Sequence, residues 1–453
     1  MNTFDGFFLP QIVQGDIEEW RTLHAGQLLV RYPVLTRTQV AAVWLHLLTN
    51  RNRVLVHAPV ANIVSAIAAA AAQLRTNGDE TIALVSAATG YSAPVVAETF
   101  ERMCADWSES SLNTLIASEL GDMRVLDQPV PDAGATDKLT AAFGYPRAFH
   151  VFSGNVPGVA VTSLIRSLLV KSATFGKTAS GEPVLPILFA RALHQVAPEI
   201  AACIALSYWP HDGVTQTAAL ELSDLVVVYG GADAVRSIRS TAPGETRVVV
   251  HGPRLSFGLV GPHATAQTVR SVATAIAAYD QQGCVSPHVV YVIGDRARAR
   301  TFAGDVAREL QQLAVTLPRG TITPGEAVAI RNARTAAEFA DNAELFGSEQ
   351  AGFSVIYEDT PDFKLSCLNR VLYVKPLSAA ADVLPVLPRR DVLQSAALDG
   401  FEENEKAELA RALGLSGISR VTSFDRLPWP PMHWHHDGSS PLRELVWWQD
   451  IES

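Results

Sequence analysis

"VVVYGGADAVRSI", residues 226 to 238, predicts a β-branched strand, a turn at Gly230 and Gly231, and the start of a helix. A strand that passes through glycines into a helix places backbone N–H groups and a helix N-terminus where they can bind a phosphate. The stretch lacks a complete GxGxxG or GxxxxGK[ST] motif, so neither the usual dinucleotide fingerprint nor a P-loop is present. A plain strand-to-helix turn is the alternative interpretation.

Short β-branched runs alternate along the whole chain with segments of helical length. Residues 61–76 and 182–196 carry apolar side chains at three- and four-residue spacing, which is typical of helices. This alternation predicts an α/β fold with a mostly parallel sheet covered on both faces. Ligands of such sheets lie beyond the carboxyl ends of the strands. The predicted strands are 53–58, 81–87, 148–154, 167–173, 203–209, 225–231, 247–252 and 288–294.

The composition favours an enzyme with a large core. The chain has 453 residues, 48% hydrophobic and 18% charged, which suits two or three domains. The net charge is −10 and no dense basic run is present, so nucleic acid is not an expected partner. Four scattered cysteines without CxxC spacing indicate reduced thiols. The N-terminal stretch has no basic region, and the most apolar segment, 64–74, is too short to span a bilayer, so we expect a cytoplasmic protein without a membrane span.

Cys284 is the cysteine whose surroundings suggest chemistry. It stands in "YDQQGCVSPHVVYV" (279–292), between a predicted helix that Gly283 would end and a β-branched run. A thiolate in a partly exposed polar loop is a strong acyl acceptor. On the alternative interpretation Cys284 is a small buried hydrophobic residue, which suffices for the other three cysteines.

Two further residues occur in "FSGNVPGVAVTSLIRSLLVKSATFGKTASGEP" (152–183). Asn155 precedes a Val-Pro-Gly turn, where an Asn is either a turn former or cap, or an amide that donates to an oxyanion. Lys171 is predicted to end the next strand, where a buried cation needs a ligand hydroxyl, a phosphate or water.

The C-terminal "HWHHDG" (433–438) raises the question of a metal site. His433, His435 and Asp437 alternate on an extended chain, but a metal site needs three or four convergent ligands. We therefore predict no metal and expect a hydrogen-bonded tail packed through its aromatic residues.

Several stretches together resemble one known family. The similarity to the bacterial acyl-CoA reductases is carried by "SGNVPG" (153–158), "SLIRSLLVKSA" (163–173), "GKTASGEP" (176–183), "HGPRLSFGLVG" (251–261), "DQQGCVSPHVVYV" (280–292), "SCLNRVLYVKP" (366–376) and the Pro-rich "WHHDG" tail. That family includes the fatty-acid reductase that supplies aldehyde for bacterial bioluminescence, and it belongs to the aldehyde dehydrogenase superfamily. The similarity is specific over residues 145–300 and at the tail.

The resemblance implies an aldehyde-dehydrogenase-like fold. We expect a Rossmann-type nicotinamide-cofactor domain at 1–250 with a small oligomerisation arm at about 120–147, as in a homo-oligomer. An α/β catalytic domain at 251–415 would carry Cys284. A tail at 416–453 would pack back on the cofactor domain.

The resemblance also implies roles for individual residues. Cys284 matches the nucleophile and Asn155 the oxyanion-hole amide. Lys171 matches the lysine that binds the adenosine ribose. Gly230 and Gly231 occupy the turn whose helix N-terminus lies near the cofactor pyrophosphate.

Two departures from the superfamily pattern indicate the direction of the reaction and the cofactor. His251 occupies the position of the Glu that activates water in hydrolytic members, so a thioacyl-enzyme would be spared from hydrolysis. His251 itself would assist either by proton transfer or by packing. Thr174, three residues after Lys171, replaces the Glu that often contacts the ribose 2′-hydroxyl. NADPH is therefore expected, with NADH as the alternative.

The resulting prediction is a fatty acyl-CoA reductase that forms an aldehyde through a thioester on Cys284. The acyl donor would be acyl-CoA or an acylated carrier or synthetase protein. Two alternatives stay open. One is an NAD(P)-dependent aldehyde dehydrogenase that works in the oxidative direction, and the other is a non-redox acyl-transfer subunit.

Overall fold

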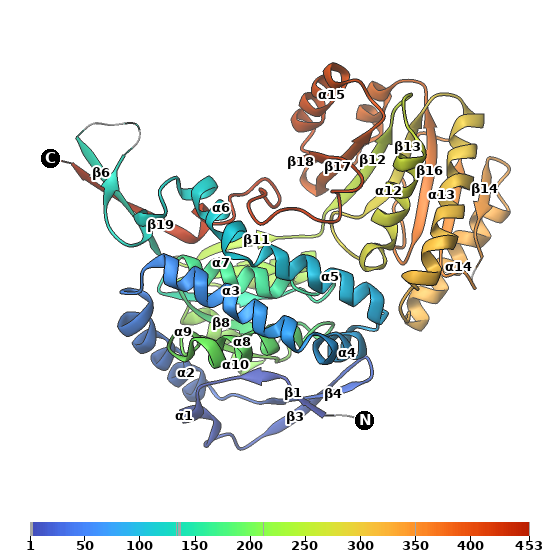
Figure 1. The fold of residues 1–453 in the computed structure, drawn as a ribbon. Helices are drawn as coiled ribbons and strands as arrows, with labels where there is room; N and C mark the ends of the chain where they lie inside the picture. The colour runs from blue at the N-terminus through green and yellow to red at the C-terminus, as the bar shows by residue number, and fades with distance from the viewer. Residues whose placement is uncertain (1–2, 133, 135–136, 212, 349, 453) are drawn as a thin grey trace. The chain divides into compact units, whose positions relative to one another are not determined.

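The computed structural model describes residues 3–132, 134, 137–211, 213–348 and 350–452. The chain forms two compact units, drawn in Figure 1. The first unit contains residues 1–89, 100–252 and 431–453, and the second contains 90–99 and 253–430. The boundary after residue 252 lies close to the expected one after 250. The expected tail at 416–453 is divided, because residues up to 430 belong to the second unit.

A six-stranded sheet forms the centre of the first unit. Its strands are β2 (Phe7–Phe8), β7 (Arg147–Val151), β8 (Ala173–Lys177), β9 (Ile204–Ser207), β10 (Leu225–Tyr229) and β11 (Arg247–His251). The helices after β7 are α7 (Val159–Leu169), α8 (Leu185–Val196), α9 (Pro198–Ala201), α10 (Val214–Glu221) and α11 (Ala232–Thr241). The spatial order is β11-β10-β7-β8-β9-β2, and only the β2–β9 pair is antiparallel. Each parallel pair that follows in sequence is joined through a helix, as parallel crossovers require.

The strand order reverses at β7. The chain moves from β7 through β8 to β9 and then returns to the other side of β7 with β10. The segments that leave the carboxyl ends of β7 and β10 therefore flank a switch point, which is where parallel sheets bind ligands. Asn155 follows β7, and Gly230 and Gly231 follow β10.

Aromatic side chains fill the core on one face of this sheet. Phe149 on β7 lies opposite Phe175 on β8, and the ring of Trp209 lies 6.1 Å and 5.0 Å from them between centroids. Helix α2 (Arg37–Asn50) packs on the same core through Val40, Val43, Trp44 and Leu47.

The N-terminal part of the first unit is mainly helical. Its elements, beside α2, are β1 (Thr3–Asp5), α1 (Gln11–Gln14), β3 (Trp20–Ala25), β4 (Leu28–Pro33), η1 (Arg51–Leu55), α3 (Val60–Thr76), α4 (Gly78–Thr89), α5 (Ala93–Asp106), α6 (Glu109–Leu120) and η2 (Met123–Leu126). Residues 93–99 of α5 are assigned to the second unit. The predicted strands 53–58 and 81–87 are wrong, because they lie in η1 with its following turn and in α4. In α4 the buried Thr81, Val85 and Ala88 recur at helical spacing, and this packing outweighs β-propensity.

The predicted strand 167–173 is also wrong. Helix α7 continues to Leu169, and β8 begins only at Ala173. Residues 160, 161 and 163–169 of α7 are all buried, so the helix presents little surface to solvent. A short apolar run of this kind cannot be distinguished from a buried strand by its periodicity.

A three-stranded antiparallel sheet forms an arm of the first unit (Figure 1). It consists of β5 (Val130–Pro131), β6 (Lys138–Gly144) and β19 (Val446–Glu452), with η6 (Arg443–Leu445) leading into β19. Strand β19 pairs with β6 over seven residues, from Val446 opposite Gly144 to Glu452 opposite Lys138. The expected arm at 120–147 thus includes the chain's C-terminal strand; residues 133, 135 and 136 lie outside the described part.

A seven-stranded sheet forms the second unit. Its elements are β12 (Leu255–Val260), α12 (Ala266–Ala277), η3 (Ala278–Gln281), β13 (Pro287–Ile293), α13 (Arg296–Thr316), α14 (Pro324–Glu338), β14 (Ala343–Phe346), β15 (Ser354–Glu358), β16 (Val371–Leu377), η4 (Ala380–Val386), η5 (Arg390–Val392), β17 (Leu393–Asp399), α15 (Glu403–Leu415) and β18 (Arg420–Thr422). The order is β14-β15-β16-β13-β12-β17-β18, and only β14 runs antiparallel to its neighbour. β13, which follows Cys284, is buried along all seven residues.

Within the described residues no single helix is long and apolar enough to cross a membrane. Only the bent pair Arg37–Leu55 and Val60–Thr76, with an angle of 115° between its halves, passes by length and composition.

Candidate active site

Cys284 lies on the turn between η3 and β13 in the second unit, and it is half-buried. Its carbonyl oxygen accepts a hydrogen bond of 2.8 Å from the hydroxyl of Ser256 on β12. The helix that was expected to reach Gly283 ends at Ala277, and the chain then passes through η3 with left-handed residues before the turn. The thiol is therefore held at a strand entrance and not in the core.

The other three thiols are poor nucleophiles because of burial. Burial raises the pKa of both Cys104 and Cys203 to about 12, and it also raises the pKa of Cys367. A thiol with a raised pKa has little thiolate at neutral pH.

Arg420 supplies a positive charge near Cys284. Burial lowers the pKa of Arg420 to about 10, while Tyr279 and Cys284 act in the opposite direction. The Arg420 guanidinium thus interacts electrostatically with Cys284. The guanidinium is fixed by hydrogen bonds of 2.8 Å and 2.6 Å to the carbonyls of Leu427 and Arg426.

Asn155 is exposed on the loop between β7 and α7 in the first unit. Two glycines shape this loop. A Cβ at Gly154 would lie 2.7 Å from the backbone nitrogen of Glu182, and Gly158 has a φ of 98° with Met103 packed against it. The loop therefore presents Asn155 at the carboxyl end of β7, where the sequence predicts it.

The structure corrects the placement of Lys171 and Thr174. Lys171 lies before β8, at the opposite end from the carboxyl edge, and its Nζ forms an ion pair of 2.6 Å with Asp127. Its side chain is only 8% exposed. Thr174 is fully buried within β8 and donates its hydroxyl to Ser167 at 2.8 Å. Lys171 is thus a buried cation paired with Asp127.

Lys177 is the lysine at the carboxyl end of β8. Its Nζ donates to the side-chain oxygen of Gln216 at 3.3 Å. The residue three positions further is Ser180, which is exposed and carries no charge. Sequence reasoning missed Lys177 because it placed the end of the strand four residues too early; "GKTASGEP" was the available signal.

Gly230 and Gly231 lie where the sequence predicts them, between β10 and α11. Gly231 is the N-cap of α11, and a Cβ there would meet no atom within 4 Å. The N–H of Gly230 donates to the carbonyl of His251 at 3.2 Å. The first turn of α11 thus faces open space at the carboxyl edge of the sheet, which fits a phosphate ligand.

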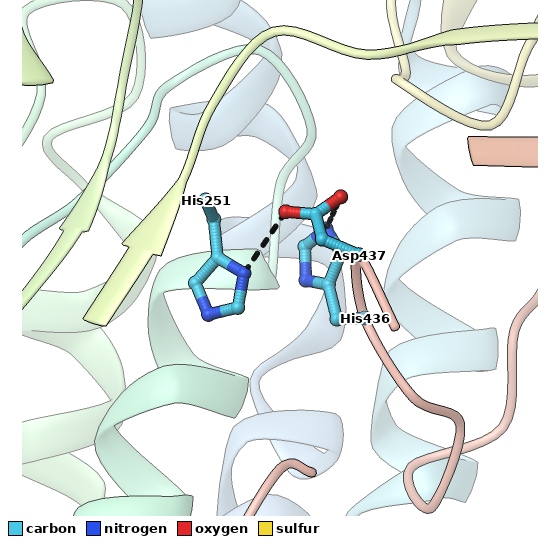
Figure 2. A group of neighbouring side chains, drawn as sticks. All are labelled: His251, His436 and Asp437. Carbon is cyan, nitrogen blue, oxygen red and sulfur yellow. Dashed lines mark hydrogen bonds and ion pairs between the residues drawn. The ribbon is translucent and has the colours of Figure 1, made fainter. Parts of the chain in front are cut away.

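His251 ends β11 and lies in a stack of aromatic rings. Its imidazole stacks on Tyr229 and on His436, with 4.4 Å between ring centroids in each pair. His436 in turn stacks on Trp434 at 4.7 Å. Figure 2 shows the carboxylate of Asp437 beside both imidazoles, and Nδ1 of His251 lies 3.2 Å from Asp437 Oδ2. His436 and Asp437 are partners of His251 that sequence reasoning did not identify.

The ring geometry favours a hydrogen-bonded cluster over a metal centre. His251, His436 and Asp437 each offer a ligand atom, and these atoms lie within 4.8 Å of one another. A metal binds an imidazole nitrogen in the plane of the ring. The two imidazole planes differ by only 18° and are stacked, so they share no point near the nitrogens. The rings would have to rotate out of the stack to bind an ion.

Burial also shifts the pKa of two groups of the first unit, His150 on β7 and Glu182 before α8. Burial, and secondarily His251, lower the pKa of His150 to about 3, so His150 is neutral at pH 7. Burial raises the pKa of Glu182 to about 7, although its carboxylate accepts hydrogen bonds from the N–H groups of Val184 and Leu185.

Comparisons with known proteins identify the family of this chain. The family model described as acyl-CoA reductase (LuxC) matches residues 55–448. The long-chain acyl-protein thioester reductase of Aliivibrio fischeri is 27% identical over 370 residues, which cover 79% of this chain and 74% of the relative. The corresponding reductase of Photobacterium phosphoreum is 27% identical over 353 residues, covering 75% and 69%.

Solved structures show the same fold over the whole chain. Aldehyde dehydrogenase 21 from Physcomitrella patens matches with a TM-score of 0.80 at 12% identity, covering 100% of this chain and 98% of that protein. NADP-dependent glyceraldehyde-3-phosphate dehydrogenase from Bacillus halodurans, solved with NADP, matches with a TM-score of 0.76 at 15% identity, covering 96% and 95%. The predicted α/β, aldehyde-dehydrogenase-like fold is confirmed. The chain has an aldehyde-dehydrogenase-like fold and belongs to the LuxC acyl-CoA reductase family.

Proposed function

We propose that this protein reduces a fatty acyl thioester to the aldehyde with NADPH, through a thioester formed on Cys284. The observation that carries the proposal is the environment of Cys284. Among the chain's thiols it combines partial exposure, a turn at a strand entrance and a nearby guanidinium. These are the properties of a reactive cysteine in an acyl-transfer reaction.

The first half of the reaction transfers the acyl group to the enzyme. The Cys284 thiolate attacks the thioester carbonyl, and a carbon–sulfur bond forms as the donor thiolate leaves and takes up a proton. One thioester replaces another, so the step needs no ATP. The Asn155 amide is the proposed donor to the tetrahedral oxyanion, and losing such a donor in other enzymes costs about 3 kcal/mol.

The second half releases the product. NADPH, when bound, supplies a hydride to the carbonyl carbon of the thioester. The resulting thiohemiacetal breaks its carbon–sulfur bond, which frees the aldehyde and restores the Cys284 thiolate. Asn155 would donate to this oxyanion as well.

The carboxyl edge of the first sheet would hold the cofactor. Lys177, and not Lys171, is the proposed contact to the adenosine ribose. Gly230 and Gly231 leave the N-terminus of α11 open to the pyrophosphate. The position of the acidic residue that opposes a 2′-phosphate is occupied by Ser180, and this supports NADPH, with NADH as the alternative cofactor.

His251 would protect the thioester from water. The imidazole of His251 is packed between the rings of Tyr229 and His436 and hydrogen-bonded to Asp437, so it cannot rotate freely. It provides no carboxylate base for water, so hydrolysis is expected to be slow.

The acyl donor and the assembly state are part of the proposal. The named relatives are acyl-protein thioester reductases; an acylated partner protein, such as a carrier or synthetase, is therefore a candidate donor beside acyl-CoA. We also propose a homo-oligomer formed through the arm. Five large apolar side chains of β6 and β19 are about 40% exposed: Leu139, Phe143, Trp447, Trp448 and Ile451.

The test offers graded acyl-CoAs and an acylated carrier protein with NADPH or NADH, and follows cofactor absorbance and aldehyde. Cys284→Ser should abolish aldehyde formation, whereas Cys367→Ser, a half-buried thiol of the same unit, should retain it. An unchanged rate in Cys284→Ser would refute the proposed nucleophile. Aldehyde oxidation without an acyl acceptor would favour an oxidative dehydrogenase, and acylation without cofactor binding would favour a non-redox acyl carrier.

A further inference from the structure

Two left-handed turns of the second unit lie against each other beside the Cys284 loop. Tyr279, Asp280 and Gln281 have φ values of 34°, 50° and 64°. Leu368, Asn369 and Arg370 have φ values of 63°, 55° and 65°. Left-handed backbone is strained for residues other than glycine, and single instances are the norm. Two consecutive triplets persist only if the surroundings hold them in place.

A buried ion pair joins the two turns. Nε of Arg370 donates to Asp280 Oδ1 at 2.7 Å, and the two side chains are 1% and 4% exposed. The second carboxylate oxygen of Asp280 accepts from the N–H of Gly320 at 2.9 Å. Arg370 also donates to the carbonyl of Leu317 at 2.7 Å and to that of Ala277, the last residue of α12, at 3.3 Å. Both partners are thus fixed on several sides.

Two glutamines extend this connection to the loop of Cys284. Gln281 donates through Nε2 to the carbonyl of Pro287 at 2.8 Å and to that of Val371 at 3.0 Å. The first of these bonds spans residues 281 to 287 and closes the loop that carries Cys284. The adjacent Gln282 donates to Asn369 Oδ1 at 2.9 Å. Each turn therefore constrains the other and the loop between them.

The ring of Tyr279 also packs against the loop that carries Cys284 and restricts it. A Cβ at Gly283 would lie 2.4 Å from the ring of Tyr279, so this ring lies directly beside the residue that precedes Cys284. The hydroxyl of Tyr279 donates to the carbonyl of Pro428 at 2.8 Å. The left-handed backbone at Tyr279 is what turns the ring into this position.

We propose that Asp280 and Arg370 are positioning residues, which clamp the two left-handed turns together and thereby hold Cys284 in the orientation for attack on a thioester. The inference rests on the proposed role of Cys284. Neither residue touches the reacting atoms in this account. Their effect is on the alignment of the sulfur with the carbonyl, for which a displacement of about 1 Å can cost about 100-fold in rate.

The same sheet offers a matched control. Lys375 on β16 donates to Glu358 Oε2, at the end of β15, at 2.8 Å, and the two side chains are 1% and 11% exposed. Arg370 precedes the first residue of β16, whereas Lys375 lies four residues into it. Glu358 also pairs with the more exposed Lys364, so Glu358→Gln breaks a buried ion pair and its exposed neighbour away from the Cys284 loop.

The experiment compares Asp280→Asn, Arg370→Lys and Glu358→Gln in the full chain. A fatty acyl-CoA without cofactor is the probe, and mass spectrometry of the Cys284 peptide gives its rate of acylation. Alkylation by iodoacetamide, a small reagent that needs no aligned carbonyl, reports on the thiol itself. Arg370→Lys keeps the charge but loses the planar guanidinium that reaches three partners, Asp280, Leu317 and Ala277.

We expect the acylation rates of Asp280→Asn and Arg370→Lys to fall by about 10-fold. Their rates of alkylation should be at least as high as that of the wild type. Glu358→Gln should lower the melting temperature and leave acylation unchanged. Wild-type acylation in both loop variants, or an equal loss in Glu358→Gln, would overturn the clamp. If either loop variant fails to fold, Gln282→Ala, which loses the bond of 2.9 Å to Asn369 and the longer bond of 3.4 Å to Glu326, replaces it with the same expected split. Wild-type protein that is not acylated on Cys284 would instead overturn the proposed function and the clamp with it.

Discussion

Glu182 makes the stability of the first unit depend on pH in an unusual direction. Its side chain is 1% exposed at the entrance to α8, and burial raises its pKa from 4.5 to about 7. The folded protein therefore binds a proton more tightly at this carboxyl than the unfolded chain does. Its contribution to stability is complete below pH 4.5 and is lost as the pH rises through about 7.

The size of the effect follows from the two pKa values. One pKa unit corresponds to about 1.4 kcal/mol, so the interval from 4.5 to about 7 corresponds to about 3 kcal/mol. Glu182→Gln removes the charge and keeps a side-chain oxygen that can accept from Val184 and Leu185. We expect the difference in free energy of unfolding, Glu182→Gln minus wild type, to increase by about 3 kcal/mol between pH 4.5 and pH 8.

The assay is urea unfolding of wild type and Glu182→Gln across this pH range, expressed as the difference between the two proteins. The difference is needed because other groups titrate as well. His150, whose pKa burial lowers to about 3, destabilises the fold as the pH falls below 6.5. It is present in both proteins and cancels. A difference that stays flat from pH 4.5 to pH 8 would refute the raised pKa of Glu182.

Three further predictions concern the two lysines, a loop and the arm. Lys171→Ala should lower the free energy of unfolding by about 3 kcal/mol, because it leaves the Asp127 carboxylate without its cation. Lys177→Ala should leave the free energy of unfolding nearly unchanged and raise the KM for NADPH. The opposite pattern in denaturation and kinetics would restore Lys171 as the cofactor contact. Gly158→Ala, at a φ of 98° and with its Cβ 2.6 Å from Cγ of Met103, should destabilise by about 2 kcal/mol in thermal unfolding, and a neutral result would contradict the packing of this loop. Trp448→Ser should shift the protein toward monomer in sedimentation, and an unchanged sedimentation profile would rule out its role in assembly.

The strands that the sequence predicts correctly are those with a clear boundary. Strand β10 ends directly before Gly230, and β13 starts at the Pro of the Ser286-Pro287 pair, so composition alone separates them from their neighbours. Gly231 was expected at a helix start, and it is the N-cap of α11. Local sequence was sufficient at these points because turn residues mark the change of conformation.

The error at Lys171 has a physical cause. Helix α7 is buried on all sides in its second half, and the apolar residues 168–170 lead from it toward β8. Without an exposed polar face neither the helical nor the strand period can be recognised. The predicted strand therefore ended at residue 173, four residues before the end of β8, and the proposed cofactor contact was assigned to Lys171 and not to Lys177.

The residues that contact His251 and support the Cys284 loop could not be predicted from the sequence for a different reason. Asp437 lies 186 residues from His251, and Arg370 lies 90 residues from Asp280. Both contacts depend on how strands are ordered, which a local pattern does not encode. The motif around Cys284 is thus readable in the sequence, while the side chains that fix its backbone are not. If the left-handed turns act as a clamp, a motif that is preserved at 279–287 is not enough for reactivity, because the segment at 368–370 must be compatible with it. A substitution far from Cys284 in sequence can then change its chemistry without touching the substrate.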